Sequence, residues 1–451
     1  MRNRITKYVS QLAEEYKRPI SVCLFGFGKT NKAIYDILQG CQCVSEITVR
    51  QSAGISDTLP NEVRLIDDRE RINALFEDLI FASPSVRREK LRVSKGSIIT
   101  SDTELFFDGE ARKSFLVSGS DGKSTVTTLS SLLLLATFPD IFVGGNIGVP
   151  LAEATLTSSL FVLELSSFNL RYLTPHCERA ALTNITPNHL DWHDGLSEYE
   201  ECKVKLLDGA RETVLNLDSP RLEEIARKRK CYALISIRLT HGEISAIYKT
   251  EHTVTAEDGK IAIDGKAILS LEEVGRKERH NLTNLMLAIG LSLGYTTEDQ
   301  IRRVAAEFSG LEHRCEIMTV GGIDYINSSI DTTPDRTKTT LTSLDKRVNI
   351  ILGGRGKGLP LDTLKSALGK YADRISLYGE VKEEVYAWLC RELPDIPCEK
   401  FDRLSDAIDH AMSGTKVGDT VLLSPAATSY GEFKDYTKRG EYFKEYIRKN
   451  A

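Results

Sequence analysis

A strand-like apolar run that ends in a glycine-rich turn and continues into a helix-like segment occurs once in each third of the chain. Such a turn joins a parallel strand to a covering helix, so its repetition favours mainly parallel sheets flanked by helices. The pattern predicts the α/β class, with three domains that each open with their own strand, turn and helix. The turns are Gly26-Phe-Gly28, Gly119-Ser-Asp-Gly122 and Gly353-Gly-Arg-Gly, and the expected domains are residues 1–110, 111–310 and 311–451.

The length and the charge agree with a globular protein that recognises small partners. A chain of 451 residues has room for about three domains, each with its own core. The 59 basic and 64 acidic residues are spread along the chain, which argues against non-specific nucleic-acid binding. The longest apolar run, around Leu132–Ala136, is far below the ~20 residues of a membrane-spanning helix. We expect no nucleic-acid partner and no insertion into a membrane.

The N-terminus and the cysteines bear on the compartment. The first 16 residues form an amphipathic, charge-dotted helical pattern without the apolar core or the cleavage site of a secretory signal. The nine cysteines are odd in number and lack CxxC spacing, which favours reduced thiols over disulfides or a zinc site. We therefore expect a cytoplasmic protein, and we take it to be a monomer.

The strongest local signal is the run from Gly119 to Thr125, which lies between a strand pattern and a helical pattern. Backbone N–H groups of such a loop cradle phosphate oxygens, a lysine neutralises the terminal phosphates, and a serine hydroxyl can bind Mg²⁺. The loop is shorter than the standard form, which would need Gly at Val117, and a tight turn without a ligand is the structural alternative. The order of strand, loop and helix favours a nucleotide site made of Gly119, Ser120, Asp121, Gly122, Lys123, Ser124 and Thr125.

Two further runs of the middle third carry metal-type ligands. Glu164 ends an apolar strand pattern, where a carboxylate is costly to bury without a cation or donors, so it suits Mg²⁺; an ion-paired or capping glutamate is the alternative. The run 184–193 follows another strand and contains His189 and Asp191, a position at which open α/β sheets place their sites. A structural histidine is the alternative there.

The remaining turns give weaker signals. The first resembles the start of a dinucleotide fingerprint, but Asn31 replaces its third glycine, so a simple turn and a diphosphate site are both open. In the last third, the run 353–358 and the run 424–433 each follow a strand. Their cations and hydroxyls suit an anionic substrate group, with a solvated basic loop as the alternative.

Taken together, these runs resemble the Mur ligase family of ATP-dependent amide-forming enzymes over essentially the whole chain. The resemblance implies a Rossmann-like N-terminal domain for the UDP end of the substrate, a P-loop central domain for ATP, and a Rossmann-like C-terminal domain for an amino acid. SDTELFF at 101–107 and SPAATS at 424–429 are most similar to the members that add D-glutamate to UDP-N-acetylmuramoyl-L-alanine in peptidoglycan precursor synthesis. The runs in family order are GSDGKST (119–125), GGNIG (144–148), LELSSFNL (163–170), NITPNHLDWH (184–193), YEECK (199–203), HNLTN (280–284), LEHR (311–314), GGRGKG (353–358) and SPAATSYGEFKDYTKRG (424–440).

The resemblance also implies a mechanism and residue roles. ATP phosphorylates the substrate carboxylate, and the amine of D-glutamate attacks the acyl phosphate, with two Mg²⁺ ions as cofactors. The implied catalytic residues are Lys123, His189, Lys203 and Lys357. The implied metal ligands are Ser124, Glu164, His189 and Lys203, the last as a carbamate. The implied nucleotide contacts outside the loop are Asn281, Asn284 and Arg314. The implied contacts to the UDP-linked substrate are Gly28, Lys29, Thr30, Asn146 and Ser166, and those to D-glutamate are Thr332, Lys357, Ser429, Tyr430 and Tyr436.

The chain also departs from the family. Where many members have N-D-S-K-A-T, this sequence has Asn327-Ser-Ser-Ile-Asp-Thr332, so Ser328 and Ile330 replace an aspartate and a lysine. Asp331 is a candidate for the missing carboxylate, and Asn169 replaces a usual glutamine. A family ligase with another acceptor, and a nucleotide-binding regulatory protein without turnover, are the alternatives. The full set of implied metal ligands argues against the second.

Overall fold

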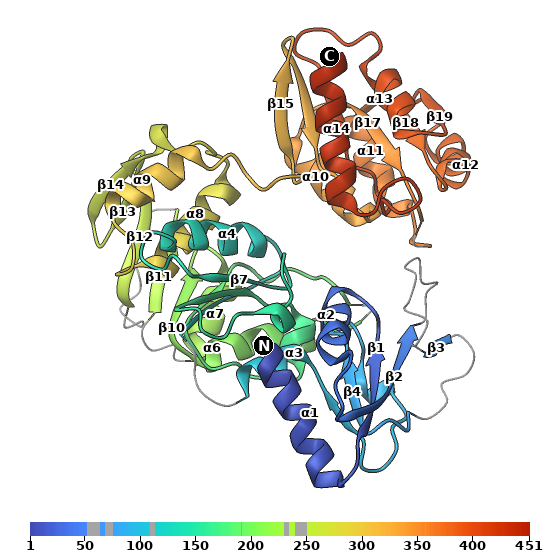
Figure 1. Ribbon diagram of the computed structural model, residues 1–451. Helices are drawn as coiled ribbons and strands as arrows, with labels where there is room; N and C mark the ends of the chain where they lie inside the picture. Colours follow the sequence, from blue (N-terminus) through green and yellow to red (C-terminus); the bar gives the residue numbers. More distant parts are fainter. Residues whose placement is uncertain are drawn as a thin grey trace. The chain divides into compact units, whose positions relative to one another are not determined.

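The structure is a computed structural model that describes residues 1–51, 64–67, 75–108, 113–190, 192–229, 234–239, 250–356 and 358–451. Two compact units divide the chain, Met1–Phe308 and Ser309–Ala451 (Figure 1). The first unit contains a five-stranded and a nine-stranded sheet, and the second unit contains a six-stranded sheet. Helices flank three mainly parallel sheets, which confirms the predicted α/β class with three sheet domains. The predicted boundaries 1–110, 111–310 and 311–451 stay a prediction.

The five-stranded sheet is wholly parallel, in the order β3-β2-β1-β4-β5. Its first helix follows from the sequence, because Ile5, Val9 and Leu12 repeat at helical spacing and are buried. The strands are β1 (Ile20–Phe25), β2 (Val44–Gln51), β3 (Arg64–Asp67), β4 (Leu79–Ala82) and β5 (Ile98–Thr100). The helices are α1 (Arg2–Tyr16), α2 (Lys29–Leu38), η1 (Arg88–Lys90) and α3 (Asp102–Phe107).

The nine-stranded sheet has the order β14-β13-β12-β11-β10-β9-β6-β8-β7 and is parallel from β7 to β12. The last two strands are antiparallel hairpin strands, turned at Asp258-Gly259 and Asp264-Gly265. The strands are β6 (Ser114–Ser118), β7 (Phe142–Gly145), β8 (Phe161–Glu164), β9 (Cys177–Leu182), β10 (Ala210–Asn216), β11 (Leu234–Arg238), β12 (Thr250–Glu257), β13 (Lys260–Ile263) and β14 (Lys266–Ser270). The helices are α4 (Lys123–Leu134), η2 (Leu151–Glu153), α5 (Ser167–Arg171), α6 (Leu196–Asp208), α7 (Pro220–Arg229), η3 (Leu271–Glu273), α8 (Arg279–Ser292) and α9 (Glu298–Glu307).

The six-stranded sheet of the second unit has the order β15-β16-β20-β17-β18-β19, and only the β15–β16 pair is antiparallel. Alternate residues of β17 enter different cores, since Ile350 and Leu352 pack into one cluster and Ile351 into the other. The strands are β15 (Glu316–Val320), β16 (Ile323–Asn327), β17 (Val348–Gly353), β18 (Ala372–Tyr378), β19 (Cys398–Phe401) and β20 (Thr420–Leu423). The helices are α10 (Pro334–Leu344), η4 (Asp362–Leu364), α11 (Lys365–Tyr371), α12 (Lys382–Glu392), α13 (Leu404–Met412) and α14 (Tyr436–Asn450).

The described residues were compared with two expectations from the sequence, those on membrane insertion and on disulfides. None of the helices in these ranges has the length and apolar character that a membrane crossing requires. No disulfide joins the cysteines that the structure describes.

Candidate active site

The loop between β6 and α4 can be built only with glycine at both ends. Gly119 has φ 144°, and a Cβ there would lie 1.8 Å from the Oγ1 of Thr183. Gly122 has φ 78°, and a Cβ there would lie 2.4 Å from the Oδ1 of Asn284 on α8. Both positions therefore combine a left-handed backbone with a close neighbour. The second approach also brings the predicted nucleotide residue Asn284 to the phosphate loop.

Two lysines converge on this loop. The Nζ of Lys123 donates to the carbonyl oxygens of Gly119 at 2.9 Å and Ser120 at 2.8 Å. The Nζ of Lys203, from α6, donates to the same carbonyl of Gly119 at 2.7 Å, and this residue is only 2% exposed. Burial, followed by the positive charge of Lys123, lowers the pKa of Lys203 well below its usual range. The Lys203 amine is therefore held beside the loop and biased toward its neutral, nucleophilic form.

Glu164 ends β8 beside the same loop and is 2% exposed. Its Oε2 accepts from the hydroxyl of Ser124 at 2.7 Å, and its Oε1 accepts from the amide of Asn146 at 2.6 Å. The predicted residues Ser124 and Asn146 thus both contact the carboxylate of Glu164. Ser124 and Glu164 offer oxygen atoms that suit a hard cation. Magnesium prefers such oxygens and takes one or two carboxylates together with water and phosphate oxygens, so the donor set fits this ion. No group of three or more His, Cys, Asp or Glu side chains suited to a metal occurs within the described ranges.

The run after β9 is hydrogen-bonded to the phosphate loop. The Oδ1 of Asn184 accepts from the backbone N–H of Asp121 at 2.9 Å. The Oγ of Ser120 lies 2.9 Å from the carbonyl oxygen of Thr186, to which it donates, and 2.8 Å from the hydroxyl of Tyr199 on α6. These bonds explain why this run lies beside the loop although more than 60 residues separate them in sequence.

The two histidines of the run have different environments. His189 is exposed, adopts φ 53°, and its ring centroid lies 5.0 Å from that of Phe168 in a tilted arrangement. His193 is buried, and its Nε2 lies 2.9 Å from the hydroxyl of Ser167. Burial, helped by the charge of Arg171, lowers the pKa of His193 to about 4, so this histidine is neutral near pH 7. Asp191, between them, lies outside the described residues.

The first glycine turn, after β1, is closed by Asn31. Its Nδ2 donates to the carbonyl oxygens of Phe25 at 3.1 Å and Gly26 at 2.6 Å, and also to that of Phe81 on β4 at 3.1 Å. The residue that replaces the third glycine of the fingerprint therefore joins the ends of two strands. Gly28 precedes the first turn of α2, where Lys29 is exposed and Thr30 is half-buried.

The second unit contains a buried arginine that the sequence analysis did not single out. Arg439 is 0% exposed, and its guanidinium donates to the Oγ and the carbonyl oxygen of Ser329 at 2.9 and 2.8 Å and to the carbonyl oxygen of Ala427 at 3.1 Å. It also lies 3.3 Å from the hydroxyl of Tyr378 and 3.4 Å from the carbonyl oxygen of Gly353. One side chain thus ties together the carboxyl ends of β16, β17, β18 and β20. Its only sequence signal is an arginine in the quoted run 424–440.

The loop after β16 holds its carboxylate inside the unit. The Oδ2 of Asp331 accepts from the hydroxyls of Thr340 and Ser424, each at 2.7 Å. The Oγ of Ser328 accepts from the backbone N–H of Cys315 at 3.3 Å. Ser328, which replaces the family's aspartate, and Asp331, the candidate for the missing carboxylate, are therefore both engaged in hydrogen bonds within this unit.

The other predicted site residues of the second unit differ in their exposure. Ser429 is buried, Tyr430 is 47% exposed, and Tyr436 begins α14. Thr332 and Arg314 are half-buried, and Lys357 lies outside the described residues.

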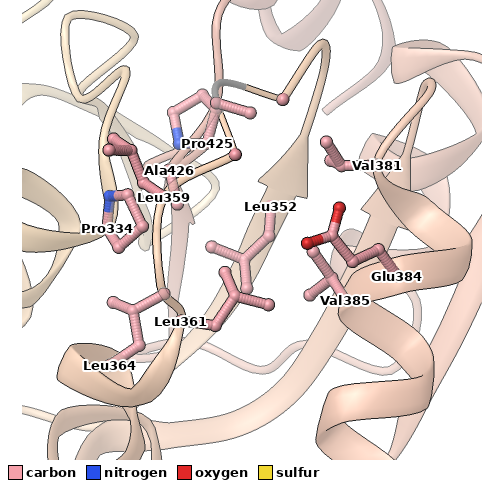
Figure 2. A pocket seen from close by; sticks show the side chains of 13 residues that line it. Pro334, Leu352, Leu359, Leu361, Leu364, Val381, Glu384, Val385, Pro425 and Ala426 are labelled. Atoms are coloured by element: carbon pink, nitrogen blue, oxygen red, sulfur yellow. The ribbon is translucent and has the colours of Figure 1, made fainter.

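Beside the loop 353–358 the second unit has a partly open apolar pocket. Figure 2 shows the side chains of Val381, Glu384 and Val385 facing those of Leu352 and Leu361 across it. Glu384 is the only carboxylate among the described residues that line it. The pocket adjoins the loop in which the sequence predicts an amino-acid site.

Of the remaining nucleotide residues in the first unit, Asn281 lies in the first turn of α8, where its amide donates to the carboxylate of Glu278 at 2.9 Å. It shares α8 with Asn284, which approaches the phosphate loop.

The structure brings several predicted site residues together at the phosphate loop. The residues are Gly119, Ser120, Asp121, Gly122, Lys123, Ser124 and Thr125 of the loop itself, with Asn146, Glu164, Lys203 and Asn284 beside it.

A phosphate loop with converging lysines and a buried carboxylate, on a parallel sheet, defines a nucleotide-binding α/β protein. Comparison with known families makes this class specific. Residues 117–292 match the family described as "Mur ligase middle domain", and residues 313–427 match "Mur ligase, glutamate ligase domain". The chain belongs to the Mur ligase family.

Similar curated proteins share one name. A "UDP-N-acetylmuramoylalanine--D-glutamate ligase" of Acetivibrio thermocellus is 33% identical over 387 residues, which are 82% of this chain and 82% of that protein. A protein of the same name from Clostridium perfringens is 33% identical over 386 residues, with the same coverage of both chains.

Solved structures share the fold at low identity. The UDP-N-acetylmuramate-alanine ligase MurC of Thermotoga maritima aligns with a TM-score of 0.57 and 16% identity, over 96% of this chain and 100% of that one. The MurF ligase of Thermotoga maritima, solved in complex with ADP, aligns with a TM-score of 0.56 and 15% identity, over 95% of each chain. These likenesses show the Mur ligase fold.

Proposed function

We propose that this chain is an ATP-dependent ligase that adds D-glutamate to UDP-N-acetylmuramoyl-L-alanine, in the cytoplasmic synthesis of peptidoglycan precursors. The observation that carries the proposal is the meeting of Ser124, Asn146 and Glu164 beside a phosphate loop that also holds two lysines. The name shared by relatives at 33% identity supports the choice of substrates.

The reaction joins an acid to an amine in two steps. A carboxylate oxygen of the UDP-linked substrate attacks the γ-phosphorus of ATP, and ADP leaves. The amine nitrogen of D-glutamate then attacks the acyl carbon, loses its proton, and the phosphate departs as the amide forms. The acyl phosphate would hydrolyse in water, so the site must hold both partners in place and exclude solvent.

The phosphate loop serves the first step. Its backbone N–H groups and the ammonium of Lys123 bind phosphate oxygens, and the Lys123 amine exchanges its present carbonyl acceptors for them. Asn284 and Asn281, on α8, and Arg314 would also contact the nucleotide in this proposal. Asn146 donates to Glu164, and in this proposal it would contact the acyl group together with Ser166.

Two magnesium sites belong to this proposal. Ser124 and Glu164 would hold one ion, and His189 with carbamylated Lys203 would hold the other. When bound, magnesium neutralises charge that develops on the phosphate oxygens. Carbamylation requires a neutral amine to attack CO₂ with release of one proton, and the lowered pKa of Lys203 favours that form.

The acceptor belongs to the second unit in this proposal. Thr332, Lys357, Ser429, Tyr430 and Tyr436 would bind D-glutamate, and Arg439 would hold the loops that carry them. We propose that the working enzyme is a monomer.

A phosphate-release assay with a panel of acceptors tests the function. ATP turnover should require both UDP-N-acetylmuramoyl-L-alanine and D-glutamate. Turnover with another amino acid and none with D-glutamate would assign a different family ligase, which the replaced residues Ser328 and Ile330 make worth testing. Nucleotide binding without an acyl phosphate that hydroxylamine can trap would assign a regulatory protein instead.

The carbamate is tested by replacing Lys203. Lys203→Ala should lose most activity and regain part of it with a small carboxylic acid such as formate. Lys205→Ala on the same helix, whose lysine donates to the carbonyl oxygen of Arg171, is the control and should stay within about threefold of the wild type. Full activity of Lys203→Ala would refute the assignment.

A further inference from the structure

Four side chains of the first unit form a continuous hydrogen-bonded series that ends at Ser166. The hydroxyl of Ser166 donates to the Oδ1 of Asn169 at 2.6 Å. The Nδ2 of Asn169 donates to the Oγ1 of Thr103 at 3.0 Å, and that hydroxyl donates to Asp102 at 3.2 Å. Thr103 and Asp102, which begin α3, are almost fully buried, and Asp102 also accepts from the backbone N–H of Ala152 at 3.1 Å. The series is anchored in the interior at one end and opens at Ser166.

The direction of these bonds follows from the backbone. The N–H of Ser166 donates to the Oδ1 of Asn169 at 3.1 Å, and a backbone N–H can only donate. The amide oxygen of Asn169 therefore faces Ser166, and its NH₂ group faces Thr103. An isoleucine or valine at position 103 would leave that NH₂ group without this acceptor.

This direction determines what Ser166 can offer to a ligand. Its proton is engaged by Asn169, and its oxygen already accepts from the backbone N–H of Asn169 at 3.2 Å. One lone pair remains, because a hydroxyl has one donor and two acceptor sites. Ser166 is 9% exposed, so a group that reaches it meets a lone pair. A carboxylate or phosphate oxygen would be repelled there, whereas an N–H would be bound.

We propose that Thr103 and Asn169 are positioning residues that fix Ser166 as a hydrogen-bond acceptor for the alanyl amide N–H of the acyl substrate. This inference rests on the proposed function, in which Ser166 lies beside the acyl group. It also accounts for Asn169, since the shorter amide is held by a hydroxyl at position 103.

A substrate analogue tests the acceptor role without any change to the protein. In UDP-N-acetylmuramoyl-L-lactate, an ester oxygen replaces the alanyl N–H, so a lone pair faces the lone pair of Ser166. Wild-type kcat/KM should fall about 10-fold or more with this analogue, and Ser166→Ala should reduce the discrimination to about 2-fold. Equal use of amide and ester by the wild type, or full discrimination by Ser166→Ala, overturns the proposal.

Variants at position 103 test the positioning role. Thr103→Val should raise KM for the UDP-linked substrate about 5- to 10-fold, with the KM values for ATP and D-glutamate and the kcat within about 2-fold. Thr103→Ser keeps the hydroxyl and should restore the wild-type KM. Thr213→Val, at a buried threonine of β10 whose Oγ1 has no hydrogen-bond partner among the described residues, is the matched control.

The outcomes separate this inference from the function on which it rests. A wild-type chain that releases no phosphate with UDP-N-acetylmuramoyl-L-alanine and D-glutamate refutes both. An active wild type, together with a Thr103→Val variant that loses thermal stability but keeps every KM, refutes the positioning role alone.

Discussion

Replacement of Arg439 by methionine should destabilise the second unit more than any single surface change. Methionine has a similar length and no charge, so the variant removes the guanidinium donors and leaves only a small change in volume. Three short hydrogen bonds disappear, to the Oγ and the carbonyl oxygen of Ser329 and to the carbonyl oxygen of Ala427. Two buried carbonyl groups then lose a partner.

The magnitude follows from those two carbonyl groups. Each buried acceptor left without a partner costs about 1–3 kcal/mol, and relief of the buried guanidinium charge offsets part of the sum. We expect a loss of about 3–4 kcal/mol. Arg439→Lys keeps the charge but cannot reach both Ser329 and Ala427 from one ammonium, so about half of the loss should remain.

Urea unfolding of the full chain can resolve this unit because the two tryptophans lie in different units. In a Trp192→Phe background, Trp388 of α12 is the only indole and reports on the second unit. With a slope of about 2 kcal/mol per molar urea, the midpoint should fall by about 1.5–2 M. Arg347→Met is the control, because that exposed guanidinium pairs with Asp373 at the surface and should change the midpoint by less than about 0.3 M.

A shift below about 0.5 M at an unchanged slope in Arg439→Met would contradict this reasoning. It would mean that the carbonyl groups find water or other donors, and that the four strand ends do not depend on the guanidinium.

Two other predictions concern the first unit. Gly122→Ala should weaken ADP binding at least 10-fold in a calorimetric titration. Gly265→Ala is the control, because Gly265 has the same φ of 78° but open space around it, and it should leave ADP binding unchanged. Equal effects of the two changes would exclude the close approach to Asn284 as the cause. His193 has a folded pKa of about 4 against an ordinary 6.5, so the unfolded chain takes up the proton first, and the stability conferred by neutral His193 falls as the pH drops from about 6.5 to 4. Urea midpoints at pH 7.5 and 4.5 should therefore differ more in the wild type than in His193→Gln, and an equal difference would contradict the lowered pKa.

The sequence predicted best those parts of the site in which neighbouring residues do the work. The loop 119–125 binds through its own backbone and the lysine that follows it, so strand, loop and helix order suffices to find it. Glu164 was predictable because a carboxylate at the end of an apolar strand needs partners. Its partner Ser124 was predicted from the loop pattern and its partner Asn146 from the family resemblance, and the structure joins both to it directly.

Contacts between distant segments could not be predicted from the sequence. Arg439 binds residues that lie 12 to 110 positions away, and Thr103 meets Asn169 across 66 positions. Hydrophobic periodicity carries no information about such pairs, because Arg439, Thr103 and Asn169 each look like an ordinary polar residue of a helix. The run 184–193 shows the same limit, since only the fold reveals that His189 is exposed and His193 buried.

In the loop after β16, two departures from the family pattern, at positions 328 and 331, depend on each other. The pattern N-D-S-K-A-T has its carboxylate at the second position and alanine at the fifth, whereas this chain has Ser328 and Asp331 there. The Asp331 carboxylate is buried and bound by Thr340 and Ser424, and Ser328 is 0% exposed, so an aspartate at 328 would bury a second charge in the same loop. Ser328→Asp alone should therefore destabilise the second unit by about 3 kcal/mol or more, whereas Ser328→Asp with Asp331→Ala should recover at least about 1 kcal/mol relative to the sum of the single changes. Additive midpoints in the Trp388 urea assay would show instead that the two positions are independent.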